Sequence, residues 1–196
     1  MGLPNLLTLS RIPLLFVVSA CLFLPSPGPS FALVLFLVAA ATDWADGWVA
    51  RRTGDVSDFG KLMDALADKV LLSGILVVLL ATELLPAWSL FFVLLILTRE
   101  FWITGLRLVA ASRGVVLAAE RLGKYKTVFQ IVAAALLLLA HSLAADFGLP
   151  ADRGAVPFLD GAGIAAFLAA AVLTVVSGSV YLWKYRDLMG FGDSER

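Results

Sequence analysis

Residues 42–68 read TDWADGWVARRTGDVSDFGKLMDALAD, and this stretch decides the fold. It carries two pairs of aspartates, Asp43 with Asp46 and Asp64 with Asp68, separated by a short polar connection. Residues three or four apart share one face of a helix, so each pair is predicted to point in one direction. A short connection makes the two helices antiparallel neighbours, which would bring four carboxylates together at one depth.

Long apolar runs lie on both sides of this stretch. The chain has 196 residues, of which 61% are hydrophobic and 15% are charged, whereas a soluble domain averages ~25% charged residues. A helix needs about 20 mostly apolar residues to span a membrane. The sequence therefore predicts an all-α, polytopic membrane protein, one domain over residues 1–196 with six transmembrane helices. The predicted spans are 5–24, 31–51, 61–82, 87–111, 125–145 and 161–184.

Positively charged residues predict how these spans are oriented. Lysine and arginine gather between spans two and three, between spans four and five, and after span six, while the opposite connections hold only Arg153. The positive-inside rule then predicts a multi-pass protein of the cell (inner) membrane, with both termini and the aspartate motif on the cytoplasmic side. The formal net charge is zero, so nucleic acid is not expected as a partner.

Four acids inside a membrane need protonation or a counter-charge, because a charged residue at the centre of a spanning helix costs ~2.5–3.5 kcal/mol. The chain has one cysteine, Cys21, and one histidine, His141, so a Cys/His metal site is not possible. Oxygen ligands alone suit hard ions such as Mg²⁺, Mn²⁺ or Ca²⁺. Intramembrane acids also mark ion pathways, so a divalent-cation transporter is the alternative from a different functional class.

The complete pattern resembles the signature of the CDP-alcohol phosphotransferase family, with every position filled. The resemblance implies the six-span fold of that family, a homodimer, and two divalent ions, Mg²⁺ or Mn²⁺. It also implies roles for the motif residues. The metal ligands would be Asp43, Asp46, Asp64 and Asp68, with Asp68 also the general base, and the nucleotide pocket would be lined by Gly47, Ala50, Arg51 and Gly60.

Three further segments are similar to the bacterial phosphatidylglycerophosphate synthases, a branch of this family. They are residues 5–11, residues 98–107 and residues 123–130. This similarity implies transfer of a phosphatidyl group from CDP-diacylglycerol to sn-glycerol 3-phosphate, within the lipid of the membrane. Inositol phosphate, serine or phosphatidylglycerol remain alternative acceptors, because pocket shape sets the choice and one sequence does not show it.

An acceptor that carries a phosphate needs cations near the site. Arg99 lies in an apolar run beside Glu100, so either an ion pair or a substrate contact is required there, and substrate binding is preferred. For Lys124 and Lys126, the competing interpretation is that they are ordinary positive residues beside the end of a membrane span. The predicted acceptor-phosphate ligands are Arg99, Arg107, Lys124 and Lys126, and the predicted edge of the pocket is Asn5, Thr8 and Arg11.

Overall fold

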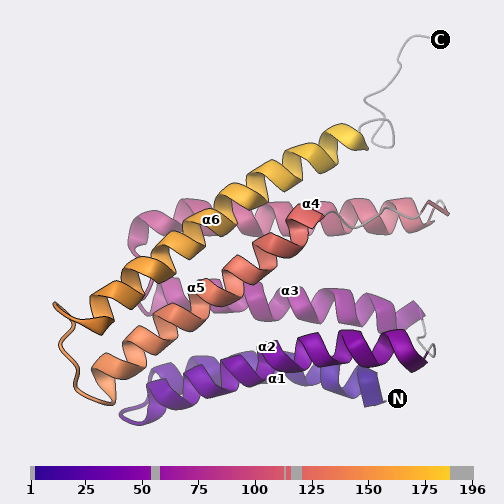
Figure 1. The fold of residues 1–196 in the computed structure, drawn as a ribbon. Helices are drawn as coiled ribbons and strands as arrows, with labels where there is room; N and C mark the ends of the chain where they lie inside the picture. The colour runs from indigo at the N-terminus through magenta and orange to yellow at the C-terminus, as the bar shows by residue number, and fades with distance from the viewer. Residues whose placement is uncertain (1–2, 54–57, 113, 116–120, 186–196) are drawn as a thin grey trace.

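The fold is a bundle of helices (Figure 1). The computed structural model describes the backbone of residues 3–53, 58–112, 114–115 and 121–185, and the side chains of residues 11–42, 69–112, 114–115 and 122–185. Within these ranges the regular structure is entirely helical, as the sequence predicts. The elements are α1 (Leu3–Leu22), α2 (Gly28–Thr53), α3 (Asp58–Ala81), η1 (Ala87–Ser89), α4 (Leu90–Ser112), α5 (Arg121–Ala145) and α6 (Ala155–Lys184).

The breaks between helices follow the turn residues of the sequence. Proline has a fixed φ and no N–H, so it does not continue a helix, and the proline-rich segment that begins at Pro25 follows the end of α1. Pro29 lies in the first turn of α2, where proline is tolerated. Gly148 and Gly154 adopt φ values of 65° and 81° in the connection before α6. Each long helix corresponds to one predicted apolar segment, but α6 begins at Ala155, six residues before the predicted span. These six residues include Pro157, which lies in the first turn of α6, where proline is tolerated.

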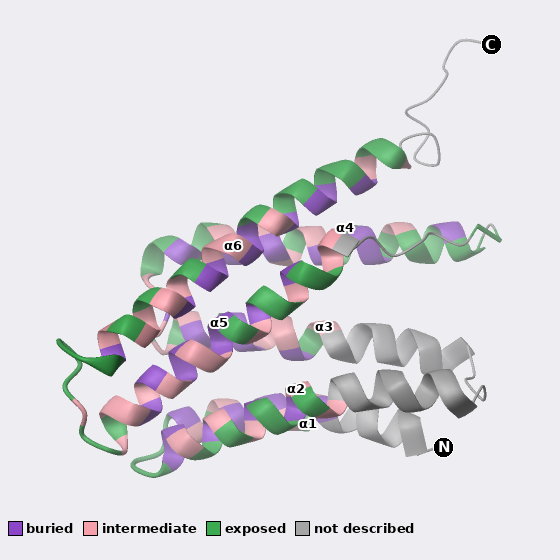
Figure 2. Cartoon of the chain, viewed as in Figure 1, coloured by how far each residue is buried: buried purple, intermediate pink, exposed green. Residues whose placement is uncertain are grey.

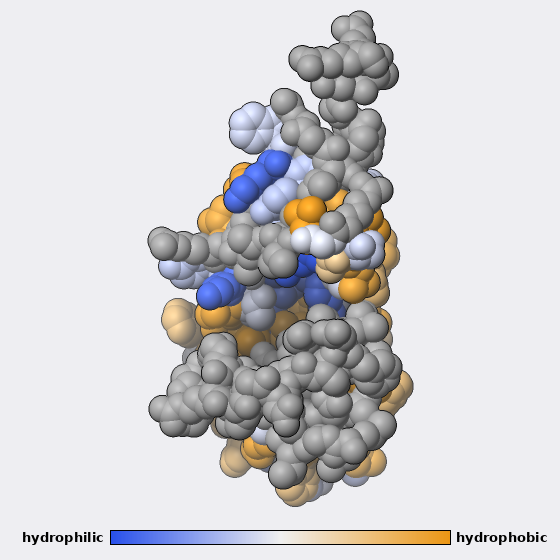
Figure 3. All heavy atoms as spheres, turned by 90° about the vertical axis from the view of Figure 1, so that its right-hand side faces the viewer, coloured by the Kyte–Doolittle hydropathy of each residue, from blue (hydrophilic) through white to orange (hydrophobic). Residues whose placement is uncertain are grey.

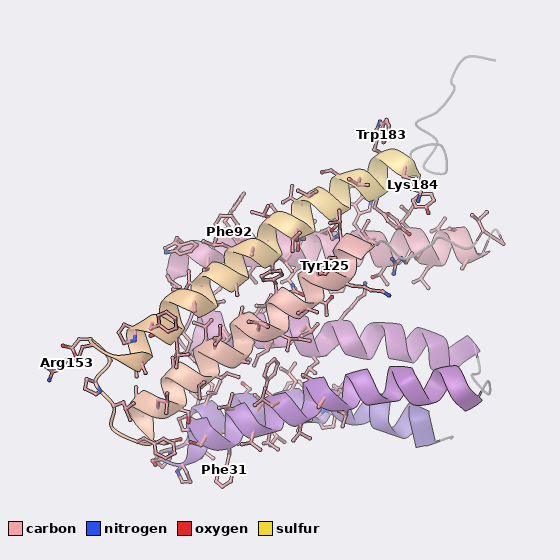
Figure 4. The ribbon with its side chains drawn as sticks, viewed as in Figure 1. Phe31, Phe92, Tyr125, Arg153, Trp183 and Lys184 are labelled. Atoms are coloured by element: carbon pink, nitrogen blue, oxygen red, sulfur yellow. The ribbon has the colours of Figure 1, made fainter. Side chains whose placement is uncertain are left out.

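Successive long helices run in opposite directions, which gives the bundle two distinct ends (Figure 1). We call the end where α2, α4 and α6 finish and α3 and α5 begin the signature end. The opposite end holds the connections 23–27, 82–86 and 146–154. Lys184 lies at the signature end and Arg153 at the opposite end (Figure 4). Successive connections therefore fall at alternate ends of the bundle.

The described side chains have the surface of a membrane protein. Phe91 is 66% exposed and Phe101 is 67% exposed, and many other large apolar side chains point outward from the same helices. A soluble monomer rarely exposes such a continuous apolar surface. Three helices in the described ranges are long and apolar enough to span a membrane: Ala87–Ser112, Leu122–Ala145 and Ala155–Lys184. Shorter apolar stretches lie in α1, α2 and α3, at Arg11–Leu22, Gly28–Thr42 and Lys69–Ala81.

Many of the residues that are buried between the helices (Figure 2) are small, which lets the helices pack closely. α5 and α6 lie against each other over much of their length, and α1 packs on both α2 and α3. A Cβ added at Gly163 of α6 would lie 2.8 Å from Leu137 Cγ of α5. Lipid is as apolar as leucine, so such close van der Waals contact, rather than exclusion of water, holds spanning helices together.

At the opposite end, a carboxylate joins α2 to the chain after α5. Asp146 Oδ2 accepts hydrogen bonds from the backbone N–H of Ser30 at 2.7 Å and from its hydroxyl at 2.6 Å. The Ser30 and Ser142 hydroxyls share a further bond of 2.7 Å. Ser30 lies in the first turn of α2, where backbone N–H groups lack helical partners and a negative charge is favourable. Asp146 therefore caps α2 from another part of the chain.

Candidate functional site

The signature residues all lie on helices at one end of the bundle. Asp43 and Asp46 are in the last three turns of α2, and Asp64 and Asp68 are in the first three turns of α3. The side chains of these four aspartates, and of Gly47, Ala50, Arg51 and Gly60, lie outside the described residues, so their predicted convergence stays a prediction. The same holds for Asn5 and Thr8 of α1. Among the described side chains, no three His, Cys, Asp or Glu residues lie close enough together to hold a metal ion.

The described part of the site is centred on Glu100 of α4. Its carboxylate contacts three cations: Arg99 Nη1 at 3.0 Å from Oε1, Lys69 Nζ at 3.5 Å from Oε2, and Lys126 Nζ, which donates directly to Oε1. Lys69 comes from α3 and Lys126 from α5, so one carboxylate joins side chains of three helices. We refer to Lys69, Arg99, Glu100, Thr104 and Lys126 as the Glu100 cluster.

Hydrogen bonds to α4 fix the position of Lys69. Its ammonium group donates to the backbone carbonyl of Glu100 at 3.3 Å and to the Thr104 hydroxyl. Thr104, one turn further along α4, donates its own proton to the same carbonyl at 2.6 Å. Lys69 was not among the predicted site residues, although a cation directly after Asp68 in an apolar helix was a usable signal.

Two arginines tie α4 to α6. Arg99 Nη2 donates to Ser177 Oγ at 3.0 Å. Arg107 Nε donates to the Tyr181 hydroxyl at 3.2 Å, and its guanidinium carbon lies 5.4 Å from the centre of that ring. Ser177 and Tyr181 are four residues apart and share a face of α6. The arginines predicted to bind acceptor phosphate thus have protein partners, and neither α6 partner was expected, because hydropathy gives no signal for them.

The burial of the predicted cations separates them into two groups. Lys126 is 4% exposed and Arg11 is 1% exposed, whereas Arg107 and Lys124 are exposed at the signature end. Tyr125, between the two lysines, is 58% exposed. The usual enrichment of lysine and arginine beside the ends of membrane spans explains an exposed Lys124. It does not account for a buried Lys126, whose desolvation requires the Glu100 carboxylate.

Hydrophilic side chains gather in a recess at this end of the molecule (Figure 3). Beside it, an apolar groove of about 480 Å³ lies between α4 and α6, and Arg99 and Thr98 are among its few polar lining residues. The site therefore combines buried cations with an adjacent apolar surface, within the part of the chain that the structure describes. Such a combination suits a ligand that is anionic at one end and apolar at the other.

Comparisons with known proteins find a matching family model and similar chains. The family model for CDP-alcohol phosphatidyltransferase matches residues 1–182. A protein of Bacillus subtilis named CDP-diacylglycerol–glycerol-3-phosphate 3-phosphatidyltransferase is 39% identical over 94% of this chain and 93% of its own length. A protein of the same name from Escherichia coli is 37% identical over 96% of this chain and 97% of its own. Another from Rickettsia felis is 33% identical over 92% of this chain and 93% of its own.

Proposed function

Because the chain belongs to the CDP-alcohol phosphatidyltransferase family, we propose that it transfers the phosphatidyl group of CDP-diacylglycerol to sn-glycerol 3-phosphate. The products are phosphatidylglycerophosphate and CMP. Family membership favours this enzyme over the divalent-cation transporter. The relatives named above carry this activity in their names and align with almost the whole chain, which supports the same donor and acceptor here.

The Glu100 cluster is the observation that supports an acceptor with a phosphate group. Arg99, Lys69 and Lys126 are held around one carboxylate, between the middle of α4 and the signature end of the bundle. A phosphate is bound well by such cations through charge-assisted hydrogen bonds. The carboxylate of serine is balanced by its own ammonium group, and the phosphodiester of a second lipid carries one charge, so neither matches these cations as well as a phosphate monoester does. The cluster supports a phosphate-bearing acceptor, and the names of the relatives support glycerol 3-phosphate over inositol phosphate.

The carboxylate side chains of the signature are suitable ligands for a divalent metal. Four carboxylates supply only hard oxygen ligands, which suit Mg²⁺ or Mn²⁺, and they lie on helix segments at the same end of the bundle. We propose that Asp43, Asp46, Asp64 and Asp68 hold two such ions. When bound, the ions would neutralise negative charge on the diphosphate of the donor.

The chain's own residues would perform the proton transfer and the positioning. Asp68 accepts the proton of the acceptor's primary hydroxyl as that oxygen forms a bond to the lipid-linked phosphorus. The bond from this phosphorus to the bridging oxygen breaks, and CMP leaves with that oxygen. Gly47, Ala50 and Gly60 leave room for the nucleotide, and the fork of Arg51 can bond two phosphate oxygens. No histidine or cysteine nucleophile is available among these residues, which favours direct transfer.

We further propose that all six long helices span the cell (inner) membrane, with the signature end and both termini in the cytoplasm, and that the protein is a homodimer. Positive charges near the signature end support this orientation. Labelling whole cells with a membrane-impermeant thiol reagent tests it, in a Cys21→Ala background. An Arg153→Cys variant should be labelled and a Lys184→Cys variant should not. The reverse pattern would refute the orientation, and light scattering of the purified protein tests the dimer.

Release of CMP from CDP-diacylglycerol by the purified protein tests the function. The acceptors offered should be sn-glycerol 3-phosphate, inositol phosphate, serine and phosphatidylglycerol, each with Mg²⁺ or Mn²⁺. We expect turnover with glycerol 3-phosphate and little with the others. Turnover with inositol phosphate and none with glycerol 3-phosphate would overturn the acceptor. Absence of CMP release with every acceptor would overturn the proposed reaction.

A further inference from the structure

The Glu100 cluster has more positive charge than it needs to balance its carboxylate. Lys69, Arg99 and Lys126 all contact Glu100, and each contact is an ion pair with that same group. Three cations against one carboxylate leave two positive charges uncompensated among these residues. In addition, Arg99 Nε is buried without a hydrogen-bond partner in the described part of the chain.

Such a surplus among the described side chains favours the binding of an anion at a poorly hydrated site. Glu100 is 9% exposed and Lys126 is 4% exposed, so water solvates these groups poorly. A charge removed from water without a partner is strongly unfavourable. A phosphate monoester carries about −1.5 to −2 charge near pH 7 and three strong acceptor oxygens. Its charge matches the surplus of the cluster, whereas a neutral or zwitterionic alcohol does not.

The position of Glu100 explains how the cations stay close together. Lysine ammonium groups sit on long, flexible stems, and like charges a few ångströms apart repel each other strongly away from water. Glu100 holds Lys69 from α3 and Lys126 from α5, and Thr104 gives Lys69 a second acceptor. Without the carboxylate, the cations are expected to separate towards water.

We propose that Glu100 is a positioning residue, whose carboxylate holds Lys69, Arg99 and Lys126 in the arrangement that binds the phosphate of the acceptor alcohol. This inference rests on the proposed function and adds Lys69 to the acceptor-phosphate ligands. Lys69 directly follows Asp68 on α3, and one residue rises ~1.5 Å along a helix. The cluster therefore lies at the same level of α3 as the last aspartate of the signature.

Steady-state kinetics of a Glu100→Gln variant test the proposal. Glutamine keeps the size and one acceptor oxygen but removes the charge that collects the cations. We expect KM for glycerol 3-phosphate to rise about 10-fold or more, with kcat and KM for CDP-diacylglycerol within about threefold of wild type. Competitive inhibition by inorganic phosphate should weaken in parallel. Glu100→Asp keeps the negative charge on a shorter side chain, so its KM for glycerol 3-phosphate should lie between those of wild type and Glu100→Gln.

The matched control is Glu83→Gln, which removes the same charge from an exposed position at the opposite end of the bundle. It should leave every kinetic constant unchanged. If Glu100→Gln lowers thermal stability but leaves KM for glycerol 3-phosphate unchanged, the residue is only structural and the proposal is wrong. A lower KM would also overturn it, because the carboxylate would then merely repel the acceptor.

A second variant keeps the proposal testable if Glu100→Gln does not fold. Lys69→Met retains the length of the stem and removes the ammonium group, so it should raise KM for glycerol 3-phosphate by a similar factor. Lys184→Met, at the end of α6, is its control. An unchanged KM in Lys69→Met would overturn the proposal. Failure of the wild-type protein to use glycerol 3-phosphate would instead refute the proposed function, which separates the two outcomes.

Discussion

Arg99 Nη2 lies 3.0 Å from Ser177 Oγ, and this hydrogen bond links the middle of α4 to the signature half of α6. The same guanidinium forms an ion pair with Glu100 through Nη1. Gly178, the next residue of α6, leaves room for the arginine: a Cβ placed there would lie 3.0 Å from Arg99 Cγ. One planar side chain therefore fixes the distance between two helices and belongs to the Glu100 cluster.

A double-mutant cycle should measure this link. Ser177→Ala removes an acceptor and is expected to lower the free energy of unfolding by about 1 kcal/mol. Arg99→Met should cost more, because it also leaves part of the Glu100 charge unpaired. The double variant should be less destabilised than the sum of the two, by about 1 kcal/mol. Thermal unfolding in detergent gives these values, and strict additivity would show that the bond contributes nothing.

Replacing any one signature aspartate by asparagine should abolish most of the activity. Loss of a metal ligand removes several kcal/mol of transition-state stabilisation, which is more than about 100-fold in rate. Asp43→Asn and Asp68→Asn are the informative variants, and the control is Asp55→Asn, which alters an aspartate that fills no signature position. Chelation of divalent ions should stop CMP release, and Mg²⁺ or Mn²⁺ should restore it. Full turnover of Asp68→Asn would remove that residue from the role of base.

Close packing of α5 and α6 should make Gly163 intolerant of a larger side chain. The nearest atoms to a Cβ there are Leu137 Cγ at 2.8 Å and Cδ2 at 3.0 Å, with the Leu137 backbone nitrogen at 3.3 Å. Gly163→Ala is expected to destabilise the protein by about 1–3 kcal/mol without changing KM for either substrate. Gly161 faces open space on the same helix, so Gly161→Ala is the matched control and should be neutral or slightly stabilising. Equal thermal stability of the two variants would contradict the packing argument.

Stability should depend on pH through Asp146. Burial raises the pKa of this carboxyl, but hydrogen bonds from Ser30 and Ser26 lower it by a larger amount. The pKa of Asp146 therefore lies below the usual range for aspartate. A group with a depressed folded-state pKa contributes stability above its unfolded pKa, ~3.9 for aspartate. That contribution is lost as the pH falls through the folded value.

Asp146→Asn tests this dependence. The variant should be less stable than wild type at neutral pH, and the difference should shrink as the pH is lowered below about 4. Asp152→Asn, which alters an exposed residue in the same connection, is the control. Unfolding temperatures measured across the pH range give the comparison. A constant difference between Asp146→Asn and wild type at every pH would show that the carboxylate charge is not involved.

The sequence alone determined the helical class, the order of the helices and the reaction family. Apolar runs and turn residues are local properties, so each predicted span corresponds to a helix from α1 to α6. The signature is also local, because its spacing of three and four residues places aspartates on one face of a helix. These features needed no knowledge of which helix lies beside which.

Only the tertiary structure decided the partners of the cations. The sequence placed Arg99 beside Glu100 but left open whether an ion pair or a substrate satisfies it, and it did not single out Lys69 or Ser177. These contacts join residues 31 and 78 positions apart. They depend on which faces of α3, α4, α5 and α6 meet, and helix rotation is set by packing across the whole bundle rather than by any one segment.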